Sequence, residues 1–301
     1  MPRFVTVGLD GSAESRAAAE WAAREANLRG LPLKLVHVWE PVPGAMAEAP
    51  LLGDETHEHW TGRIPRDAAG GLRRRHPGLD VTTEQVSGGP AEVLAGLTQD
   101  TELLVLGTRG LGGIGGFMVG SVSLAVVAHA MRPVVLVRAG EQAADEHETD
   151  PAGVPSAAAP FRPVVLGLDT DSPDDTVIAF AFEEAARRAT SVHVVHGWSV
   201  PSYYTYSLAA GVDLRDELSG QQAAALTEVL RPWRQKYPSV EVVEESRFGS
   251  AGDLLAEASR EASLVVVGRR FRRNPLGTHI GSVTHAVMHH AVVPVAVVPH
   301  D

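Results

Sequence analysis

The sequence predicts two tandem doubly wound α/β domains, each with a five-stranded parallel sheet and helices on both faces. Three observations support this prediction. Short aliphatic runs alternate with amphipathic segments of helical period along the chain. The same order of segments occurs twice. Residues 139–161, between the two copies, lack apolar periodicity and are rich in Ala, Pro and acids, which is typical of a linker.

Four segments of the first half have counterparts in the second half, at an offset of 159 to 161 residues. Such a constant offset indicates a tandem duplication of a domain of roughly 140 residues. We therefore expect one domain at 1–138 and a second at 162–301. The matched pairs are FVTVGLDGS (4–12) with PVVLGLDTD (163–171), LKLVHVWE (33–40) with VHVVHGWS (192–199), ELLVLGTRG (102–110) with SLVVVGRRF (263–271), and VGSVSLAVVAHAMRPVVLVR (119–138) with IGSVTHAVMHHAVVPVAVVP (280–299).

The elements of each copy follow from these apolar periods. In the first copy we expect strands near 4–10, 33–39, 81–86, 102–107 and 133–138, and helices near 13–29, 56–75, 90–99 and 119–130. In the second copy we expect strands near 163–169, 191–198, 240–246, 263–268 and 294–298, and helices near 174–189, 212–236, 250–261 and 281–291.

The last aliphatic strand of each copy is expected at a sheet edge, where an uncovered strand tends to aggregate. Pairing of these two edges with each other would give an internal pseudo-dimer, and pairing with a second chain would give a homodimer. Edge protection within one chain is the more economical arrangement, so we expect the internal pseudo-dimer, with the homodimer as the alternative.

Composition restricts the class of protein. The chain has 301 residues, of which 44% are hydrophobic and 21% charged, as in ordinary globular proteins. It has no cysteine, so disulfides, thiol nucleophiles and thiolate metal sites are excluded. The formal charge of −11 argues against nucleic-acid or anionic-membrane binding. No apolar run reaches the length of a membrane span, and no signal-peptide pattern opens the chain, so we expect a cytoplasmic protein.

The stretch GTRGLGGIGGFMVGS (107–121) carries the main functional signal. It lies between a buried strand and a helix, and its glycines are spaced G-x2-G-x9-G at Gly107, Gly110 and Gly120. Glycines let a ligand approach the backbone, and the first turn of the following helix offers free N–H groups and a positive dipole end. Residues 103–138 contain no acid, and Arg109 is basic. These features together predict a phosphate site.

Other interpretations of single motifs are less consistent with the sequence. A GxGxxG pattern at 110–115 follows the fourth strand rather than the first, and no acid lies in the next two dozen residues, unlike a dinucleotide site. No GKS or GKT is present for a Walker loop. His57-Glu58-His59 is more typical of a solvated helix face than of a metal site, and His285 with His289 lacks a third ligand. No set of residues is typical of a catalytic centre.

With this glycine spacing, followed by Ser121, the chain resembles the universal stress protein family, in its tandem actinobacterial type. The VGLDGS and LVHVW segments also lie where that family has them. The resemblance implies a site for ATP, alone or with Mg²⁺, in which Asp10 contacts the ribose and the backbone of Val38 contacts the adenine. Gly107 and Gly110 would line the ribose and first phosphates, and Gly120, Ser121, Val122 and Ser123 would bind the phosphates. The alternative for Asp10 is a cap on the helix starting near Ala13.

The second copy departs from the family pattern. It keeps the positions of Asp169, Gly268, Gly281, Ser282, Val283 and Thr284, but Gly197 stands at the adenine position. Phe271 replaces the second glycine, and Asp171, Asp174 and Asp175 would repel phosphates. Arg269, Arg270, Arg272 and Arg273 could partly offset this through arginine–phosphate pairs. We expect a weak or empty second site.

Two classes of function therefore remain. The resemblance favours a regulatory binding module of the stress response, whose ATP occupancy changes its shape or its unidentified protein partner. The competing class is an enzyme, a slow ATPase or a phosphoryl-transferring protein, for which the sequence offers Arg109 but no evident base. A structural partner protein would leave the glycine pattern unexplained.

Overall fold

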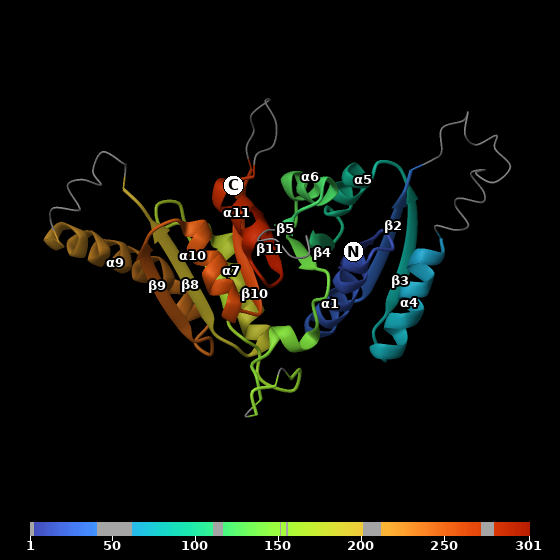
Figure 1. Cartoon of the computed structure of the whole chain (residues 1–301), viewed down its shortest axis with the longest axis horizontal. Helices are drawn as coiled ribbons and strands as arrows, with labels where there is room; N and C mark the ends of the chain where they lie inside the picture. The colour runs from blue at the N-terminus through green and yellow to red at the C-terminus, as the bar shows by residue number, and fades with distance from the viewer. Residues whose placement is uncertain are drawn as a thin grey trace. The chain divides into compact units, whose positions relative to one another are not determined.

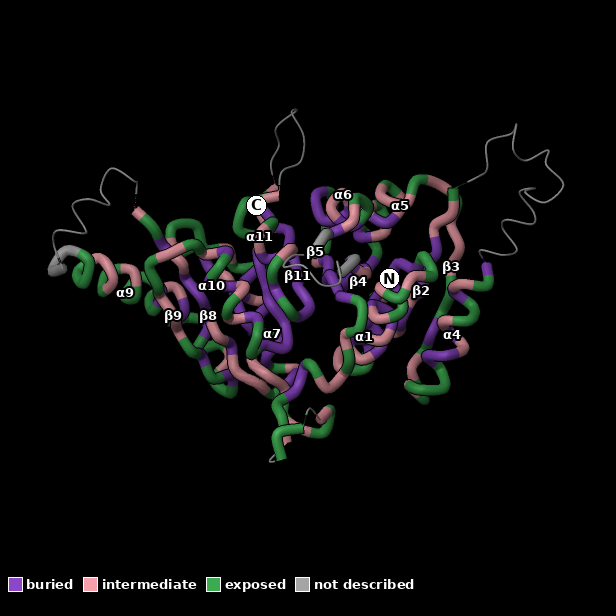
Figure 2. Tube along the Cα trace, in the orientation of Figure 1, coloured by how far each residue is buried: buried purple, intermediate pink, exposed green. Residues whose placement is uncertain are grey.

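The structure, a computed structural model, describes residues 3–40, 62–110, 117–150, 152–154, 156–200, 212–271 and 280–301. The described chain forms two compact units, and the boundary between them lies between Gln142 and Ala143 (Figure 1). We call them unit 1 and unit 2. In both, the central strands are buried and the outward faces of the helices are exposed (Figure 2).

Unit 1 alternates strands and helices in the predicted order. Its parallel strands follow the order β3-β2-β1-β4-β6, so the first and fourth strands are neighbours at the centre. The elements are β1 (Val5–Leu9), α1 (Ala13–Arg29), β2 (Leu33–Trp39), α4 (Arg63–Arg75), β3 (Val81–Ser87), α5 (Pro90–Leu97), β4 (Leu103–Gly110), β5 (Phe117–Met118), α6 (Ser121–His129) and β6 (Val134–Arg138).

Unit 2 repeats this topology, with the strand order β11-β10-β7-β8-β9. The elements are the 3-10 helix η1 (Ala143–Glu146), β7 (Val164–Gly167), α7 (Asp175–Arg188), β8 (Val192–Trp198), α9 (Val212–Lys236), β9 (Val242–Phe248), α10 (Ala251–Ala258), the 3-10 helix η3 (Ser259–Glu261), β10 (Leu264–Arg270), α11 (Ser282–His290) and β11 (Val295–His300).

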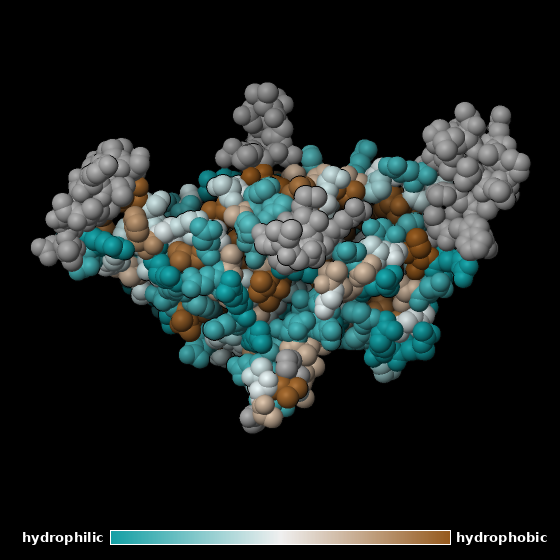
Figure 3. Space-filling view, viewed as in Figure 1, coloured by the Kyte–Doolittle hydropathy of each residue, from teal (hydrophilic) through white to brown (hydrophobic). Residues whose placement is uncertain are grey.

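Two helix pairs cover each sheet. In unit 1, α1 packs on β1 and β4 beside α4, whereas α5 and α6 pack on each other (Figure 1). In unit 2, α7 and α9 form the first pair and α10 and α11 the second. Each unit is therefore the doubly wound α/β domain that the alternating pattern predicts. On the face shown in Figure 3, hydrophobic side chains of the described residues lie in small separate groups among hydrophilic ones.

Local sequence explains why the first helices begin at different places. In unit 1, the hydroxyl of Ser12 accepts a hydrogen bond from the Ser15 N–H (3.1 Å), so Ser12 is the N-cap of α1. In unit 2, Pro173 disfavours helical geometry at Ser172. The helix starts instead at Asp175, after the N-cap Asp174, whose carboxylate accepts from the N–H groups of Thr176 and Val177.

Three details differ from the sequence-based expectation. A short strand, β5, pairs antiparallel with the end of β4, which aliphatic periodicity could not reveal because β5 has only two residues. The helix expected from residue 119 begins at Ser121, after the N-cap Gly120. The helix expected from residue 56 is seen from Arg63, and residues 56–61 lie outside the described residues.

Part of the expected linker is ordered on unit 2. The segment after Gln142 forms η1, and His147 and Phe161 make an isolated antiparallel bridge with their rings 4.0 Å apart. The guanidinium of Arg188 lies 5.7 Å from the centre of the Phe161 ring. This end of the segment therefore packs on α7 of unit 2.

Candidate functional site

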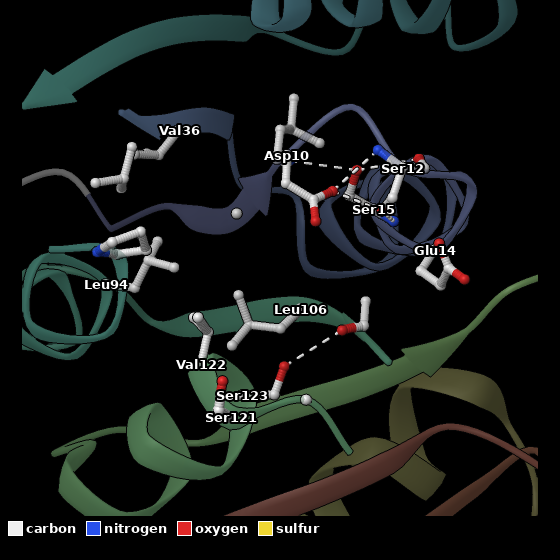
Figure 4. A pocket seen from close by; sticks show the side chains of 16 residues that line it. Asp10, Ser12, Glu14, Ser15, Val36, Leu94, Leu106, Ser121, Val122 and Ser123 are labelled. Carbon is white, nitrogen blue, oxygen red and sulfur yellow. Dashed lines mark hydrogen bonds between the residues drawn. The ribbon is translucent and has the colours of Figure 1, made fainter. Parts of the chain in front are cut away.

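A cavity of about 270 Å³ opens in unit 1 at the carboxyl ends of β1, β2 and β4 (Figure 4). In a doubly wound sheet this edge, where the winding direction reverses, is where ligands bind. The lining comes from three strands and the first turns of three helices: Gly8, Leu9, Asp10, Ser12, Glu14, Ser15, Val36, Val38, Pro90, Leu94, Leu106, Gly107, Gly120, Ser121, Val122 and Ser123.

One side of the cavity is apolar. Val36 and Val38 come from β2, Pro90 and Leu94 from α5, and Leu106 from β4. Figure 4 shows the labelled side chains of Val36, Leu94 and Leu106 grouped on this side. A slot between aliphatic side chains suits a flat ring system that is transferred out of water.

The opposite side of the cavity is polar and is built by the start of α1. Oδ1 of Asp10 accepts hydrogen bonds from the Ser12 hydroxyl (2.5 Å) and the Ser12 N–H (3.0 Å). The Ser15 hydroxyl accepts from the Asp10 N–H (3.4 Å) and donates to the Ser12 carbonyl (3.2 Å). These bonds fix the Asp10 carboxylate at the cavity edge (Figure 4). A carboxylate held in this way can accept hydrogen bonds from ligand hydroxyls.

The electrostatics of Asp10 favour its charged form. Partial burial acts to raise the pKa of this carboxyl group, but the hydrogen bonds from Ser12 and Ser15 outweigh burial and lower the pKa below its ordinary value. Asp10 is therefore an acceptor at neutral pH. The alternative in which Asp10 itself caps α1 is wrong, because Ser12 holds the N-cap position and Asp10 in turn orients Ser12.

Gly107 is required by close packing rather than by a turn. A Cβ atom at this position would lie 2.5 Å from the carbonyl carbon of Glu14 and 2.7 Å from the Ser15 nitrogen. Since these are backbone atoms of α1, they cannot move aside as a side chain could. The absence of a side chain thus brings the start of α1 against the end of β4 and closes the floor of the cavity.

Gly120, unlike Gly107, has open space around it. Nothing lies within 4 Å of the position that a Cβ would take, and the residue is the N-cap of α6 in extended geometry. No side chain caps the helix there, so its first N–H groups are available at the cavity beside Ser121 and Val122. Such a helix start favours an anion.

The Ser123 hydroxyl has a second role that the sequence did not suggest. It donates a hydrogen bond to the carbonyl of Gly107 (3.3 Å), which joins α6 to β4. The Thr284 hydroxyl makes the same contact to Gly268 in unit 2 (2.7 Å). In this arrangement Ser123 positions the two glycine segments relative to each other.

Most of the residues selected from the first copy come together in this cavity. Asp10, Val38 and Gly107 line it, as do Gly120 to Ser123. Arg109 and Gly110 lie in β4, paired with Met118 and Phe117, and their side-chain surroundings are outside the described structure. Sequence reasoning missed Ser12, Glu14, Ser15 and the α5 residues. Ser12 could have been found from the sequence, because a serine just before a predicted helix is a typical N-cap.

The equivalent region of unit 2 differs from the unit 1 cavity at two positions, one on β8 and one on β10. At Gly197, the counterpart of Val38, a Cβ would lie 2.6 Å from the Cα of Ala251, so α10 packs directly on β8. At Gly268, the counterpart of Gly107, a Cβ would lie 2.7 Å from Nε2 of His300. Helix backbone covers Gly107, whereas at Gly268 the nearest groups are the His300 ring and the Val177 side chain of α7, which lies 3.2 Å from the Cβ position.

The charges of unit 2 also differ from the expectation. Asp174 does not act as a free repulsive charge: it caps α7, and its Oδ2 lies 3.4 Å from Nδ1 of His300. The carboxylate of Asp169 accepts from the Asp171 N–H (3.0 Å). Asp171 and Asp175 are exposed.

Arg269 is only 4% exposed, its guanidinium lies 4.7 Å from the centre of the Phe271 ring, and burial lowers its pKa. Arg269 is thus not the surface cation that the sequence suggested. Arg272 and Arg273 lie outside the described residues, and Arg270 is exposed.

The glycine before the last helix is retained in unit 2. Gly281 has extended backbone angles close to those of Gly120, and nothing lies within 4 Å of its Cβ position. Ser282, Val283 and Thr284 follow it in the first turn of α11.

In the described ranges, no group of three or more His, Asp or Glu side chains is placed to hold a metal ion, and no helix is long and apolar enough to span a membrane. The rings of His285 and His289 lie 4.4 Å apart on α11. The His57-Glu58-His59 segment lies outside the described residues.

Comparison with known proteins places this geometry in a family. The model of the universal stress protein family matches residues 1–138 and again 160–299. A universal stress protein of Mycolicibacterium smegmatis is 31% identical over 309 residues, covering 98% of this chain and 96% of that protein. One of Mycobacterium tuberculosis is 32% identical over 302 residues, covering 97% and 96%.

A crystal structure of a universal stress protein from Archaeoglobus fulgidus shows the same fold, with a TM-score of 0.67 at 16% identity. The similarity covers 99% of this chain and 98% of that chain. The order of strands and the two copies of the domain therefore agree with the sequence matches. The chain belongs to the universal stress protein family, with the domain of that family present twice.

Proposed function

We propose that unit 1 binds ATP and that nucleotide occupancy regulates the interaction of this cytoplasmic protein with a protein partner in the stress response. One observation carries the proposal: a single cavity unites an aliphatic slot, a charged acceptor and an uncapped helix start. These three surfaces match the three parts of a nucleotide, which are a flat base, a hydroxyl-bearing sugar and an anionic phosphate chain.

In this proposal the adenine lies between Val38 and the α5 residues Pro90 and Leu94. The ribose hydroxyls donate to Asp10, whose lowered pKa keeps it an acceptor at neutral pH. The phosphates lie at the N–H groups that follow Gly120. Arg109, Gly110 and Mg²⁺ would complete the phosphate region.

Thermal unfolding with and without nucleotide tests the proposal. A ligand that binds only the folded state stabilises it by about 2.7 kcal/mol at a free concentration a hundredfold above Kd. Millimolar ATP with Mg²⁺ should therefore raise the Tm. GTP is the matched comparison for base selectivity. A Tm that does not respond to ATP would contradict nucleotide binding.

Slow ATP hydrolysis is the second candidate, and Glu14 is the observation that favours it. This acid lines the cavity beside Asp10, where a carboxylate could orient a water against the phosphates. Mass spectrometry of nucleotide released from the denatured protein separates the candidates. Intact ATP supports a binding module, whereas ADP supports turnover, which Glu14→Gln should then abolish.

We also propose that the two units associate through their last strands, as an internal pseudo-dimer. The reason is edge protection, because β6 and β11 are each the last strand in the order of their own unit. Separately expressed halves test this arrangement. Halves that form a 1:1 complex in size-exclusion chromatography support it, and a stable homodimer of the full chain would point to pairing between chains instead.

A further inference from the structure

Unit 1 contains a second cavity, between helices α1 and α4, with a volume of about 470 Å³. Its floor is apolar and includes Leu9, Ala19, Ile64 and Leu72. Among the residues that the structure describes, Leu9 and Ser15 alone are shared with the lining of the proposed nucleotide cavity. The two cavities therefore open on different sides of the β1–α1 junction.

Positive charge predominates at the mouth of this second cavity. Arg16, Arg74 and Arg75 face two acids, Glu20 and Asp67. Glu20 is already neutralised, because it accepts from Arg75 and lies 3.2 Å from Nε2 of His76. Burial acts to raise the pKa of Glu20, but its bonds to Arg75 and His76 lower it below the ordinary value, so Glu20 stays ionised and paired.

The remaining arginines differ in their surroundings. Arg16 donates to the carbonyl of Gly11 (2.6 Å). Among the described residues, no hydrogen bond or ion pair engages Arg74, which is exposed at the rim. A free guanidinium next to an apolar floor is suited to an anion that carries a hydrocarbon body.

The corresponding helix pair of unit 2 carries larger side chains. The counterparts of Ala19, Ala23 and Leu72 are Ile178, Phe182 and Trp233, by the offsets of the two copies. The Phe182 ring is fully buried, with its centre 5.9 Å from that of Trp233 and 5.5 Å from that of Tyr237. An aromatic cluster thus packs between the first and second helices of unit 2, where the equivalent positions of unit 1 carry smaller side chains.

Gly71 is the smallest residue of the cavity wall on α4. It lies inside α4, where glycine is unfavourable, and it lines the cavity wall. A Cβ there would meet only the flexible guanidinium of Arg75, at 3.1 Å. No backbone contact therefore requires a glycine at this position, whereas a larger side chain would enter the cavity.

We propose that the α1–α4 cavity of unit 1 binds a small organic anion, with its hydrocarbon body on the Leu9–Leu72 floor and its charge at Arg74. The site is separate from the proposed nucleotide cavity, and its ligand is of a different class. It does not depend on whether unit 1 binds ATP.

The probe is 1-anilinonaphthalene-8-sulfonate, an aromatic sulfonate whose fluorescence rises in apolar surroundings. Titration of the folded full chain should give saturable 1:1 binding. Gly71→Leu should weaken binding at least about tenfold, because the leucine fills the space that the rings need. Arg74→Glu should weaken it about three- to tenfold, because the charge-assisted contact is replaced by repulsion.

Two control variants locate the probe. Gly96→Leu adds the same side chain on another helix, α5, at an exposed position that lines neither cavity and has nothing within 4 Å of its Cβ position, and it should leave the affinity unchanged. Gly120→Glu blocks the nucleotide cavity and should also leave it unchanged. Absence of saturable binding, or equal binding by wild type, Gly71→Leu and Arg74→Glu, would overturn the proposal. Thermal melts show whether Gly71→Leu is folded, and Arg74→Glu, at an exposed rim position, provides an independent test.

Discussion

The first helix begins three residues after the strand-end aspartate in unit 1 and six residues after it in unit 2. The aspartates are Asp10 and Asp169, and the difference is close to one helical turn. In unit 1 this turn carries Ser12, Glu14 and Ser15 into the cavity. In unit 2 it is missing, and the ring of His300 lies against the strand glycine instead. A change in where the first helix starts thus changes the polar side of this region, while the strand order of the sheet stays the same.

The apolar side of the cavity differs between the two units in a similar way. Val38 lines a cavity in unit 1, whereas its counterpart Gly197 lets Ala251 of α10 approach the strand backbone. The same strand order therefore does not preserve the walls of the cavity. What preserves them is the spacing between strand ends and helix starts, which is set by single residues such as Pro173.

The largest effect is expected from glutamate at the two helix-start glycines of the full chain. Gly120→Glu should abolish stabilisation by ATP, because the new side chain and its charge occupy the phosphate region. Gly281→Glu should leave ATP stabilisation unchanged, because the rebuilt unit 2 is expected to bind weakly or not at all. Both positions are sterically open, so both variants should fold. Calorimetric titration with ATP measures the difference, and equal loss in both variants would show that unit 2 shares the binding.

A smaller effect is expected on folding stability at the two strand glycines. Gly107→Ala places a methyl group against the backbone of α1 and should cost about 3 kcal/mol in the free energy of unfolding. Gly268→Ala meets the end of the His300 side chain, which can rotate away, and should cost about 1 kcal/mol. Urea unfolding compares the two. A greater cost at Gly268 would mean that the His300 ring is held more firmly than the helix start.

Removal of the strand-end carboxylates should affect ATP affinity in unit 1 alone. Asp10→Ala removes a charged acceptor from the cavity and should cost about 1.5–3 kcal/mol of binding free energy. Asp169→Ala is the matched control and should leave the affinity of the full chain unchanged. Calorimetry on both variants measures this difference. A comparable loss from Asp169→Ala would require a contact between that residue and the nucleotide.

The smallest effect is expected on the pH dependence of folding stability, through Glu20 at the α1–α4 helix pair. The pKa of Glu20 is lowered in the folded state by Arg75 and His76, against the effect of burial. Its contribution to stability is therefore present above the pKa of the unfolded chain and is lost as the pH falls through the folded value. The counterpart in unit 2 is Ala179, beside an aromatic cluster that does not titrate in this range.

Glu20→Gln should accordingly lower the Tm at pH 7, and the difference from wild type should shrink as the pH falls below about 4. Melting curves between pH 3 and pH 7, in matched buffers, measure it. Glu241→Gln, at an exposed position just before β9, serves as the matched control for loss of a charge. A difference that grows on acidification would contradict this sign.

Local patterns in the sequence were sufficient for the fold of each unit. The alternation of aliphatic runs and helical periods, the duplication and the glycine spacing are properties of neighbouring residues, and they led to the parallel α/β fold and the family, both of which were confirmed. They also selected seven positions that line one cavity, because the carboxyl ends of β1, β2 and β4 meet in any such sheet.

Tertiary structure decided the features that depend on contacts between distant segments. Gly107 is essential because α1 passes within 2.5 Å of its Cβ position, and no pattern around residue 107 contains that distance. The contact of His300 with Asp174 joins residues more than a hundred positions apart. The cavity between α1 and α4 depends on the summed side-chain volumes of two helices, and the equivalent helices of unit 2 carry Phe182 and Trp233 in contact. Packing of this kind is fixed by three-dimensional neighbours, so the sequence alone could not reveal it.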